Sequence, residues 1–425
     1  MQLLDDFNKL TCMYTILLIY LNPLSYKIAI IIISLNYSFN LFSQYNLNPD
    51  NVNLIKSNEL KEFLNKPALN SKLIGLGEAT HGTKEFSEIK SDIVKILVTH
   101  YNYKYFILEA GFTDCIKINE FIQNKSDDSL NLFKGLPWPW ATTEFYDILV
   151  WMRNYNFNQK EPINFFGADV GNKGSIKFYK NQFSDTLSKS FVNNLIDIYA
   201  DTLKSTKYKI TLLNTLRKSI PKIDNFIDSI KMTNIFETLQ SLLLKGGARY
   251  KFRENTFANL TIKIIDHYSP NSKFIIWAHN SHISKYSNSR KSVGYFLKKR
   301  YSEKYTNFLF EFKKGTFRAV DTDSNRYENK IFKFTNFYIS PDLNKFGSQI
   351  MPDSLNYIII NIKSPLNRNL TPKTFYIHSI GAVYSLDLAK RKPALYKEKI
   401  YKNRTCDYLI IVNQTTASNN FYQFY

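Results

Sequence analysis

Short apolar segments alternate with longer segments of helical periodicity along most of the chain. Eight of these segments, each four to six residues long and rich in Ile, Phe, Tyr or Val, are typical of buried strands: residues 73–76, 105–108, 163–166, 274–278, 308–312, 357–362, 382–386 and 408–412. Between the first two, apolar residues recur mostly at spacings of three and four and indicate one face of a helix: Phe86, Ile89, Ile93, Ile96 and Leu97. This order predicts an α/β fold in which helices wrap a central, mostly parallel sheet.

The pattern changes between about residues 184 and 267. No strand is predicted there, and Leu, Ile and Phe recur at helical spacing in a Lys- and Asn-rich background, interrupted by Pro221 and by glycines at 246 and 247. We interpret this stretch as a helical insertion within one α/β domain that covers residues 45–425. We expect it to form one wall of a cleft and to influence substrate choice, because binding residues concentrate on segments that a rigid scaffold carries.

The net charge of +20 comes from 56 basic and 36 acidic residues, and it raises the question of a nucleic-acid partner. The basic residues are mostly Lys, they are spread along the whole chain, and no recognition motif for DNA or RNA accompanies them. We therefore expect a solvated basic surface and no nucleic-acid partner. Cys12, Cys115 and Cys406 cannot form a disulfide framework, and the absence of a C-x-x-C pair argues against a structural zinc site.

The N-terminal segment has the features of a secretory signal peptide. Lys27 precedes an apolar run over residues 28–35, and polar and aromatic residues then lead to the small residue Ser43. We expect residues 1–44 to be a signal peptide and the mature protein to be periplasmic or secreted. The alternative is that the apolar runs on both sides of Lys27 form one imperfect anchor, in which case the uncleaved segment would be the protein's contact with the membrane.

Polar side chains follow each of the first four predicted strands. Glu78 and His81 come after the first, Glu109 after the second, Asp169 after the third, and His279 and His282 after the fourth. Ligands of open α/β sheets bind outside the carboxyl ends of the strands, so we expect these residues to converge in one cleft.

The residue types in this cleft favour attack by water on a substrate. No G-x-S-x-G motif supplies a serine nucleophile, whereas His has a pKa suited to a general base and a neighbouring carboxylate would orient it. Histidines and carboxylates are also ligands for zinc, manganese or iron, although no diagnostic ligand spacing is present. We expect no required cofactor, and a divalent metal ion held among Glu78, His81, Glu109, His279 and His282 remains the alternative.

Several motifs in this order resemble the erythromycin esterase-like family, whose homologues include macrolide esterases and succinoglycan biosynthesis-type proteins. The matching strings are GLGEATHGTKEF (residues 75–86), YFILEA (105–110), WPW (138–140), TTE (142–144), WMRNYN (151–156), FFGAD (165–169), IWAHNSH (276–282) and GYFL (294–297). The resemblance covers about residues 55 to 390. It implies a sheet wrapped by helices and hydrolysis of a small-molecule ester, which in the family's named members is the lactone ring of macrolide antibiotics.

The resemblance also implies a set of site residues. The family's catalytic positions correspond to Glu78, His81, Glu109, His279 and His282 here. Lys90 stands where the family often has Arg, and we expect it to bind substrate together with Asp169 and Glu144. Trp138, Trp140 and Trp151 are interpreted as core residues. The alternatives are a metal-dependent hydrolase of another bond and a binding protein that keeps the fold without activity; retention of every motif carboxylate and histidine favours the esterase. The oligomeric state is not predicted.

Export is directly testable. We expect cleavage near Ser43–Gln44, because the small residue follows the apolar run at the position where signal peptides are cut. N-terminal sequencing of the protein purified from its native host measures the site. An intact N-terminus on protein recovered from the cytoplasm would contradict the prediction.

Overall fold

The computed structural model describes residues 59–129, 131–323, 333–367 and 371–421. Residues 1–44, for which a signal peptide is predicted, lie outside the described residues. Within the described ranges, no helix combines the length and the apolar content needed to cross a bilayer.

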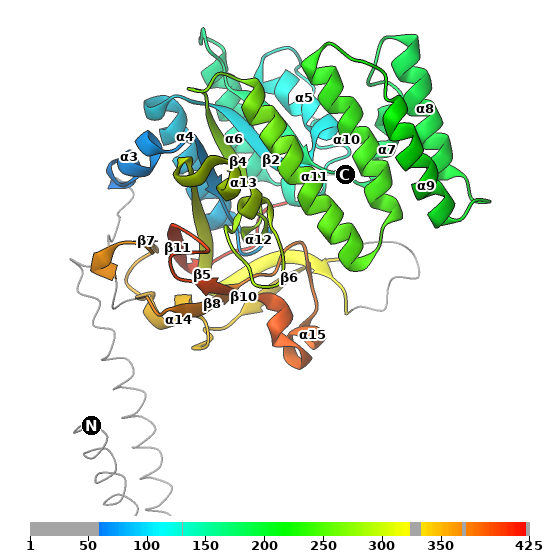
Figure 1. Cartoon of the computed structure of the whole chain (residues 1–425). Coiled ribbons are helices and arrows are strands. Elements are labelled where there is room, and N and C mark those ends of the chain that lie inside the picture. The colour runs from blue at the N-terminus through cyan, green and yellow to red at the C-terminus, as the bar shows by residue number, and fades with distance from the viewer. Residues whose placement is uncertain (1–58, 130, 324–332, 368–370, 422–425) are drawn as a thin grey trace, which may run out of the picture. The chain divides into compact units, whose positions relative to one another are not determined.

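A mostly parallel sheet forms the centre of the fold, as the sequence predicts (Figure 1). Its strand order is β3-β2-β4-β1-β5-β11-β7, with β6 and β9 pairing with the long strand β5. The strands are β1 (Leu73–Leu76), β2 (Tyr103–Gly111), β3 (Asn164–Asp169), β4 (Lys273–Trp277), β5 (Tyr305–Asp321), β6 (Phe334–Ile339), β7 (Tyr357–Asn361), β9 (Val383–Tyr384) and β11 (Tyr408–Thr415). Neighbours are parallel from β3 to β11, whereas β7 is antiparallel to β11 and β6 is antiparallel to β5. A separate two-stranded antiparallel sheet joins β8 (Thr374–His378) and β10 (Lys397–Tyr401).

All eight predicted strands are present, and three further strands were missed. The missed strands β6, β8 and β10 alternate exposed with buried residues, and β10 has the sequence KEKIY. An antiparallel strand with one face in solvent shows this alternation instead of a continuous apolar run. No apolar run in the sequence therefore marks these three strands. For the same reason β5 extends well beyond the predicted residues 308–312.

Helices cover both faces of the sheet. They are α3 (Leu60–Asn70), α4 (Lys84–Tyr101), α5 (Phe112–Ile122), α6 (Thr143–Asn156), α7 (Ile176–Tyr179), α8 (Thr186–Ala200), α9 (Thr206–Leu216), α10 (Phe226–Leu243), α11 (Gly246–His267), α12 (Asn280–Ile283), α13 (Val293–Tyr301), α14 (Phe346–Ile350) and α15 (Leu386–Arg391). In β1, Ile74 and Leu76 join the apolar core that includes Phe86 of α4, while Gly75 faces Ile283 of α12. Because alternate strand residues point to opposite faces, α4 and α12 lie on opposite sides of β1.

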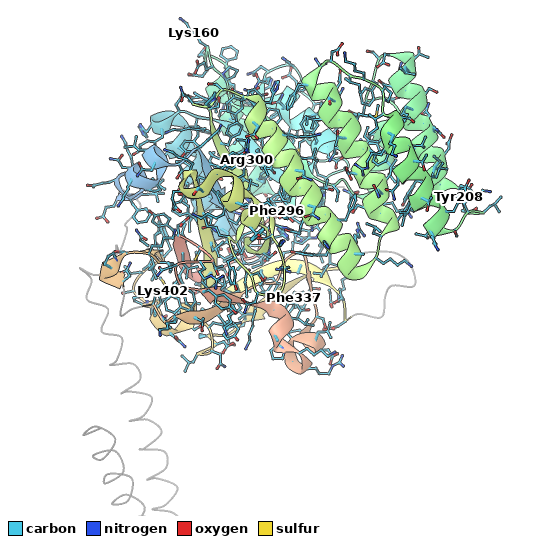
Figure 2. All side chains as sticks on the ribbon, in the orientation of Figure 1. Lys160, Tyr208, Phe296, Arg300, Phe337 and Lys402 are labelled. Atoms are coloured by element: carbon cyan, nitrogen blue, oxygen red, sulfur yellow. The ribbon has the colours of Figure 1, made fainter. Side chains whose placement is uncertain are left out.

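The predicted insertion is helical, and it has a small core of its own. Helices α8, α9, α10 and α11 lie side by side (Figure 1), and Leu195, Leu213, Phe236 and Leu239 are buried among them. Tyr208 of α9, labelled in Figure 2, is exposed at the far side of this group. Helix α11 instead packs directly against β3, and Asn234 of α10 donates a hydrogen bond to the carbonyl of Asp169 at the end of that strand.

The turn after β1 is held by distant segments of the chain. Ile380 donates a backbone hydrogen bond to Ala79, and the carbonyl of Gly82 accepts from the backbone of Arg318 and of Ser418. A Cβ atom on Gly82 would lie 1.9 Å from the carbonyl oxygen of Arg318. A glycine is therefore required for this close approach.

The substitution Gly82→Ala should destabilise the protein by about 1–3 kcal/mol or prevent folding, because the backbone must move to accommodate the methyl group. Gly247→Ala is the matched control, since a Cβ there would meet no atom within 4 Å. It should be neutral or stabilising by about 0.4–1 kcal/mol. Urea unfolding of both variants measures the difference, and equal stability for the two would contradict this account of the turn.

Candidate active site

A pocket of about 400 Å³ opens at the carboxyl ends of the strands. Its walls come from the turn after β1, from the end of β2, from the end of β3 and the residues after it, from the loop before α6, from α11, and from the residue before β9: His81, Glu109, Ala110, Pro137, Trp138, Pro139, Trp140, Asp169, Val170, Gly171, Asn172, Gly246, Arg249, Tyr250, Arg253 and Ala382. Three of the predicted site residues, His81, Glu109 and Asp169, thus line one pocket. Glu78, His279 and His282 contact His81 or Glu109, and Lys90 reaches His81 through Glu78, whereas Glu144 lies apart from this group.

Glu78 anchors His81. One carboxylate oxygen of Glu78 accepts a hydrogen bond from His81 Nδ1, and the other accepts from Lys90 Nζ and, at 3.1 Å, from the indole N–H of Trp277. The Lys90 ammonium also lies 3.9 Å from the centre of the Trp277 ring, a cation–π contact. These contacts fix the side chain of His81 at the pocket wall.

The pKa values of Glu78 and Lys90 are both lowered, for different reasons. Burial alone would raise the pKa of Glu78, but Lys90 and His81 outweigh it and lower that pKa to about 2. Burial also lowers the pKa of Lys90 to about 8, with Glu78 opposing the shift. Glu78 is therefore a carboxylate at neutral pH, and Lys90 is the cation that keeps it so.

Glu109 connects three parts of the site. One of its carboxylate oxygens accepts from the backbone N–H of His279 at 2.7 Å, and the other lies 2.7 Å from Arg253 Nη2 and 3.0 Å from His282 Nε2. Its backbone carbonyl accepts from the indole N–H of Trp140 at 3.1 Å. Burial would raise the pKa of Glu109, but His282, His81 and Arg253 hold it well below its usual range.

His282 lies between two carboxylates. Its Nε2 faces Glu109, and its Nδ1 lies 2.5 Å from Glu254 Oε1 in an ion-pair contact outside hydrogen-bond geometry. Burial would lower the pKa of His282, but the two carboxylates outweigh it and raise the pKa to about 10. His282 is therefore an imidazolium at neutral pH, with a carboxylate beside each ring nitrogen.

His279, unlike His282, is neutral at neutral pH. Its Nε2 lies 3.2 Å from the carbonyl oxygen of Ala79, which can only accept, so Nε2 carries the proton. Its Nδ1 accepts from the backbone N–H and the hydroxyl of Ser281. Burial and the nearby His81 lower the pKa of His279 to about 3, so the ring is neutral. It ties the segment after β4 to the turn after β1.

Asp169 binds Arg253 and lines the pocket. Both of its carboxylate oxygens accept from the guanidinium, with Nε at 3.0 and 2.8 Å. Burial raises the pKa of Asp169 despite Arg253, whereas Asp169 and Glu109 hold the pKa of Arg253 well above its usual range against the effect of burial. Asp169 thus positions Arg253, whose side chain remains 31% exposed at the pocket wall.

Two of the three predicted substrate-binding residues have other contacts in the structure. Lys90 is fully buried behind Glu78, so it is placed to hold Glu78 and not to contact a substrate. Glu144 does not line the pocket, and its carboxylate instead accepts from the backbone and side-chain amides of Asn419. The family motif correctly indicated polar positions, but it did not indicate which way these two side chains point.

The structure adds residues that the sequence analysis did not select. Arg253 and Glu254 stand on α11 and complete the ion-pair network. Trp140 is a buried core residue as predicted and also lines the pocket, whereas Trp138 lines the pocket without belonging to the buried core. The insertion forms one wall as expected, through Tyr250 and Arg253 of α11.

Within the described ranges, no group of three or more His, Cys, Asp or Glu side chains is arranged to hold a metal ion. The carboxylates of Glu78, Glu109 and Asp169 have cationic side-chain partners instead, namely Lys90, Arg253 and His282. The residues therefore do not fit a metal site in this arrangement, and the mechanism proposed below assigns no step to one.

The fold and the site define a class: an α/β protein whose Glu–His pocket lies at the carboxyl edge of a mostly parallel sheet. The family model for erythromycin esterase matches residues 98–415, which is most of the chain, and the protein belongs to this family.

Sequence relatives are distant. The chain is 25% identical over 198 residues to erythromycin esterase type II of Escherichia coli, covering 45% of this chain and 43% of that protein. It is 22% identical over 207 residues to erythromycin esterase type I of Escherichia coli, covering 48% and 47% of the two chains. The matches thus span about half the length of these curated relatives.

Solved structures share the fold over most of the chain. A succinoglycan biosynthesis protein has a TM-score of 0.70 at 20% identity, with 89% of this chain and 98% of that chain covered. A mutant of the erythromycin esterase EreC in its open conformation has a TM-score of 0.62 at 17% identity, with 85% and 95% covered. At these identities, the likeness establishes the fold alone.

The different charge states of His279 and His282 are testable. The pKa of His282, about 10, exceeds the ordinary value of 6.5, so folding takes up a proton there. Its contribution to stability is complete below pH 6.5 and is lost as the pH rises from 6.5 to about 10. ¹⁵N NMR at pH 8 should show His282 protonated on both nitrogens, and at pH 5 should show His279 neutral. A neutral His282 at pH 8 would contradict the assignment.

Proposed function

We propose that this protein hydrolyses an ester of a small molecule, with His81 as the general base that activates water. The observation that carries the proposal is the contact between His81 Nδ1 and the ionised Glu78 at the wall of the pocket. A carboxylate can only accept a hydrogen bond, so Nδ1 carries a proton, and in the neutral ring the lone pair is on Nε2. Nε2 is then the nitrogen available to take a proton from water.

Glu78 has the role of the orienting carboxylate in this mechanism. It holds the imidazole in one tautomer and stabilises the imidazolium that forms when water gives up its proton. Lys90 and Trp277 occupy the second carboxylate oxygen, so Glu78 cannot rotate away without breaking buried contacts. Lys90 is a positioning residue in this proposal.

The charge that develops on the carbonyl oxygen of the substrate requires a donor at the pocket wall. Arg253 is the best-placed cation, because its guanidinium lines the pocket and is held in place by Asp169 and Glu109. His279 and His282 have partners beside their ring nitrogens and do not line the pocket, so we assign them positioning roles instead of direct contact with the oxyanion. Their part in the mechanism is to hold Glu109 and the turn that carries His81.

The names of the sequence relatives support an ester as the substrate class, and the pocket restricts its size. The aromatic rings of Trp138, Trp140 and Tyr250 offer apolar walls, while Arg249 and Arg253 add charge. A macrolide lactone is one substrate of this class to test, alongside simpler esters. The volume of about 400 Å³ suits a small ligand or one part of a larger ligand.

The substitution His81→Asn should lower kcat by about 10²–10⁴-fold, since it removes the base while keeping a polar side chain of similar size. His100→Asn is the matched control, because His100 is exposed near the end of α4 and does not line the pocket. Hydrolysis of a panel of macrolides and simple esters by the protein, with and without chelator, measures the activity. Unchanged kcat in His81→Asn would exclude this base, and loss of activity with chelator would exclude a metal-free mechanism.

A further inference from the structure

A smaller pocket shares Trp138 with the candidate active site. Its volume is about 240 Å³, and its walls are mostly apolar, with Phe133, Leu136, Trp138 and Phe334 among them. The loop before α6 contributes residues to both pockets. Arg318 is the one charged residue among the described lining residues, and we call this the Arg318 pocket.

Strand β5 brings Arg318 beside the turn that carries the candidate base. The backbone N–H of Arg318 donates to the carbonyl oxygen of Gly82 at 2.9 Å, and Gly82 directly follows His81 in the chain. Two residues further along β5, the backbone N–H of Val320 donates at 3.1 Å to the carbonyl of Ala382, which lines the candidate active site. The same part of β5 therefore supports both pockets.

The guanidinium of Arg318 is a half-buried cation without an acidic partner. In the part of the chain that the structure describes, no carboxylate lies within 4.0 Å of it and no group accepts a hydrogen bond from it. Its neighbour is the ring of Phe334, whose centre is 5.1 Å away. Partial burial lowers the pKa of Arg318 and no carboxylate opposes the shift, whereas Asp169 and Glu109 raise the pKa of Arg253. A desolvated cation of this kind favours an anion as its partner.

The walls of the Arg318 pocket restrict what this anion is attached to. The rings of Trp138 and Phe334 are roughly perpendicular, with their centres 5.3 Å apart, and form two adjoining apolar faces. An Arg side chain presents its N–H donors in a planar fork that matches a carboxylate. A carboxylate on an aromatic or aliphatic group would therefore satisfy both the cation and the walls. The volume is smaller than that of a typical pocket for a whole ligand, so it suits one part of a larger molecule.

We propose that the Arg318 pocket is a second subsite of the candidate active site, and that it binds the carboxylate end of an ester substrate whose ester group lies beside His81. This inference rests on the ester hydrolysis proposed above and narrows it. The preferred substrates carry a carboxylate that an apolar segment separates from the ester, as in half-esters of dicarboxylic acids. Arg318 is a specificity-determining residue, which binds the substrate and takes no part in the proton transfer.

Binding is measurable without any reaction. In an NMR titration of the folded protein, phenylacetate should bind saturably, and its neutral counterpart 2-phenylacetamide should bind at least about tenfold more weakly, because a lost charge-assisted contact costs about 1.4 kcal/mol. The substitution Arg318→Gln should weaken phenylacetate binding about tenfold. Lys160→Gln is the matched control for charge, since Lys160 is exposed and lines neither pocket. No saturable binding of phenylacetate, equal binding of the amide, or unchanged affinity in Arg318→Gln would each overturn the proposal.

Hydrolysis tests the link between the subsite and the ester site. The monoethyl esters of the diacids from glutarate to suberate should have KM values at least about tenfold lower than the ethyl esters of fatty acids of the same chain lengths. Arg318→Gln should raise the KM of the half-esters about tenfold and leave kcat unchanged, because the carboxylate is bound equally in the ground state and the transition state. Thermal melting checks that the variant folds, and the comparison of esters on the unaltered protein does not depend on it.

The two sets of measurements separate this inference from the proposed function. Hydrolysis of the fatty-acid esters with no preference for the half-esters would overturn the subsite and leave ester hydrolysis standing. Binding of phenylacetate that depends on Arg318, without hydrolysis of any ester, would support the carboxylate pocket and contradict the proposed function.

Discussion

The buried carboxylate of Glu109 is the interaction on which the candidate active site depends. It lies at the end of β2 and contacts the backbone after β4, the imidazolium of His282 and the guanidinium of Arg253 on α11. A buried carboxylate is costly unless cations and N–H donors surround it, and removing one partner from such a group typically costs about 3–5 kcal/mol. The position of α11 against the sheet therefore depends on the carboxylate of Glu109, which also lines the pocket.

Environment gives three histidines of one site three different states. His282 lies between two carboxylates and is charged, whereas His279 lies against a carbonyl oxygen and is neutral. His81 has one nitrogen on a carboxylate, and its side chain lines the pocket. The same residue type can thus supply a base at one position and a fixed structural group at the next, because the partners of each ring decide which protons it holds.

The central strands and the convergence of the five motif residues were predictable from sequence, because buried parallel strands are continuous apolar runs and their carboxyl ends share one edge. The exposed strands β6, β8 and β10 were not, since alternating residues in a basic background do not differ from loop sequence. The direction of side chains was also beyond prediction: Lys90 and Glu144 lie in motifs, yet one is buried behind Glu78 and the other binds Asn419. Arg253 enters the site through a long-range contact with Glu109 that no local pattern encodes.

Strand β11 lies between β5 and β7 in the sheet, although it comes near the end of the described chain. The residues after it pair with the turn beside His81 and with the start of α6, through Thr83 and Ala417 and through Thr142 and Asn420. A ribosome releases β11 after every other strand of this sheet, so the sheet is completed only when β11 has emerged. Until then β5 has an open edge, which is a site for pairing with another chain. The order of strands therefore makes the nascent protein dependent on keeping that edge covered until β11 is in place.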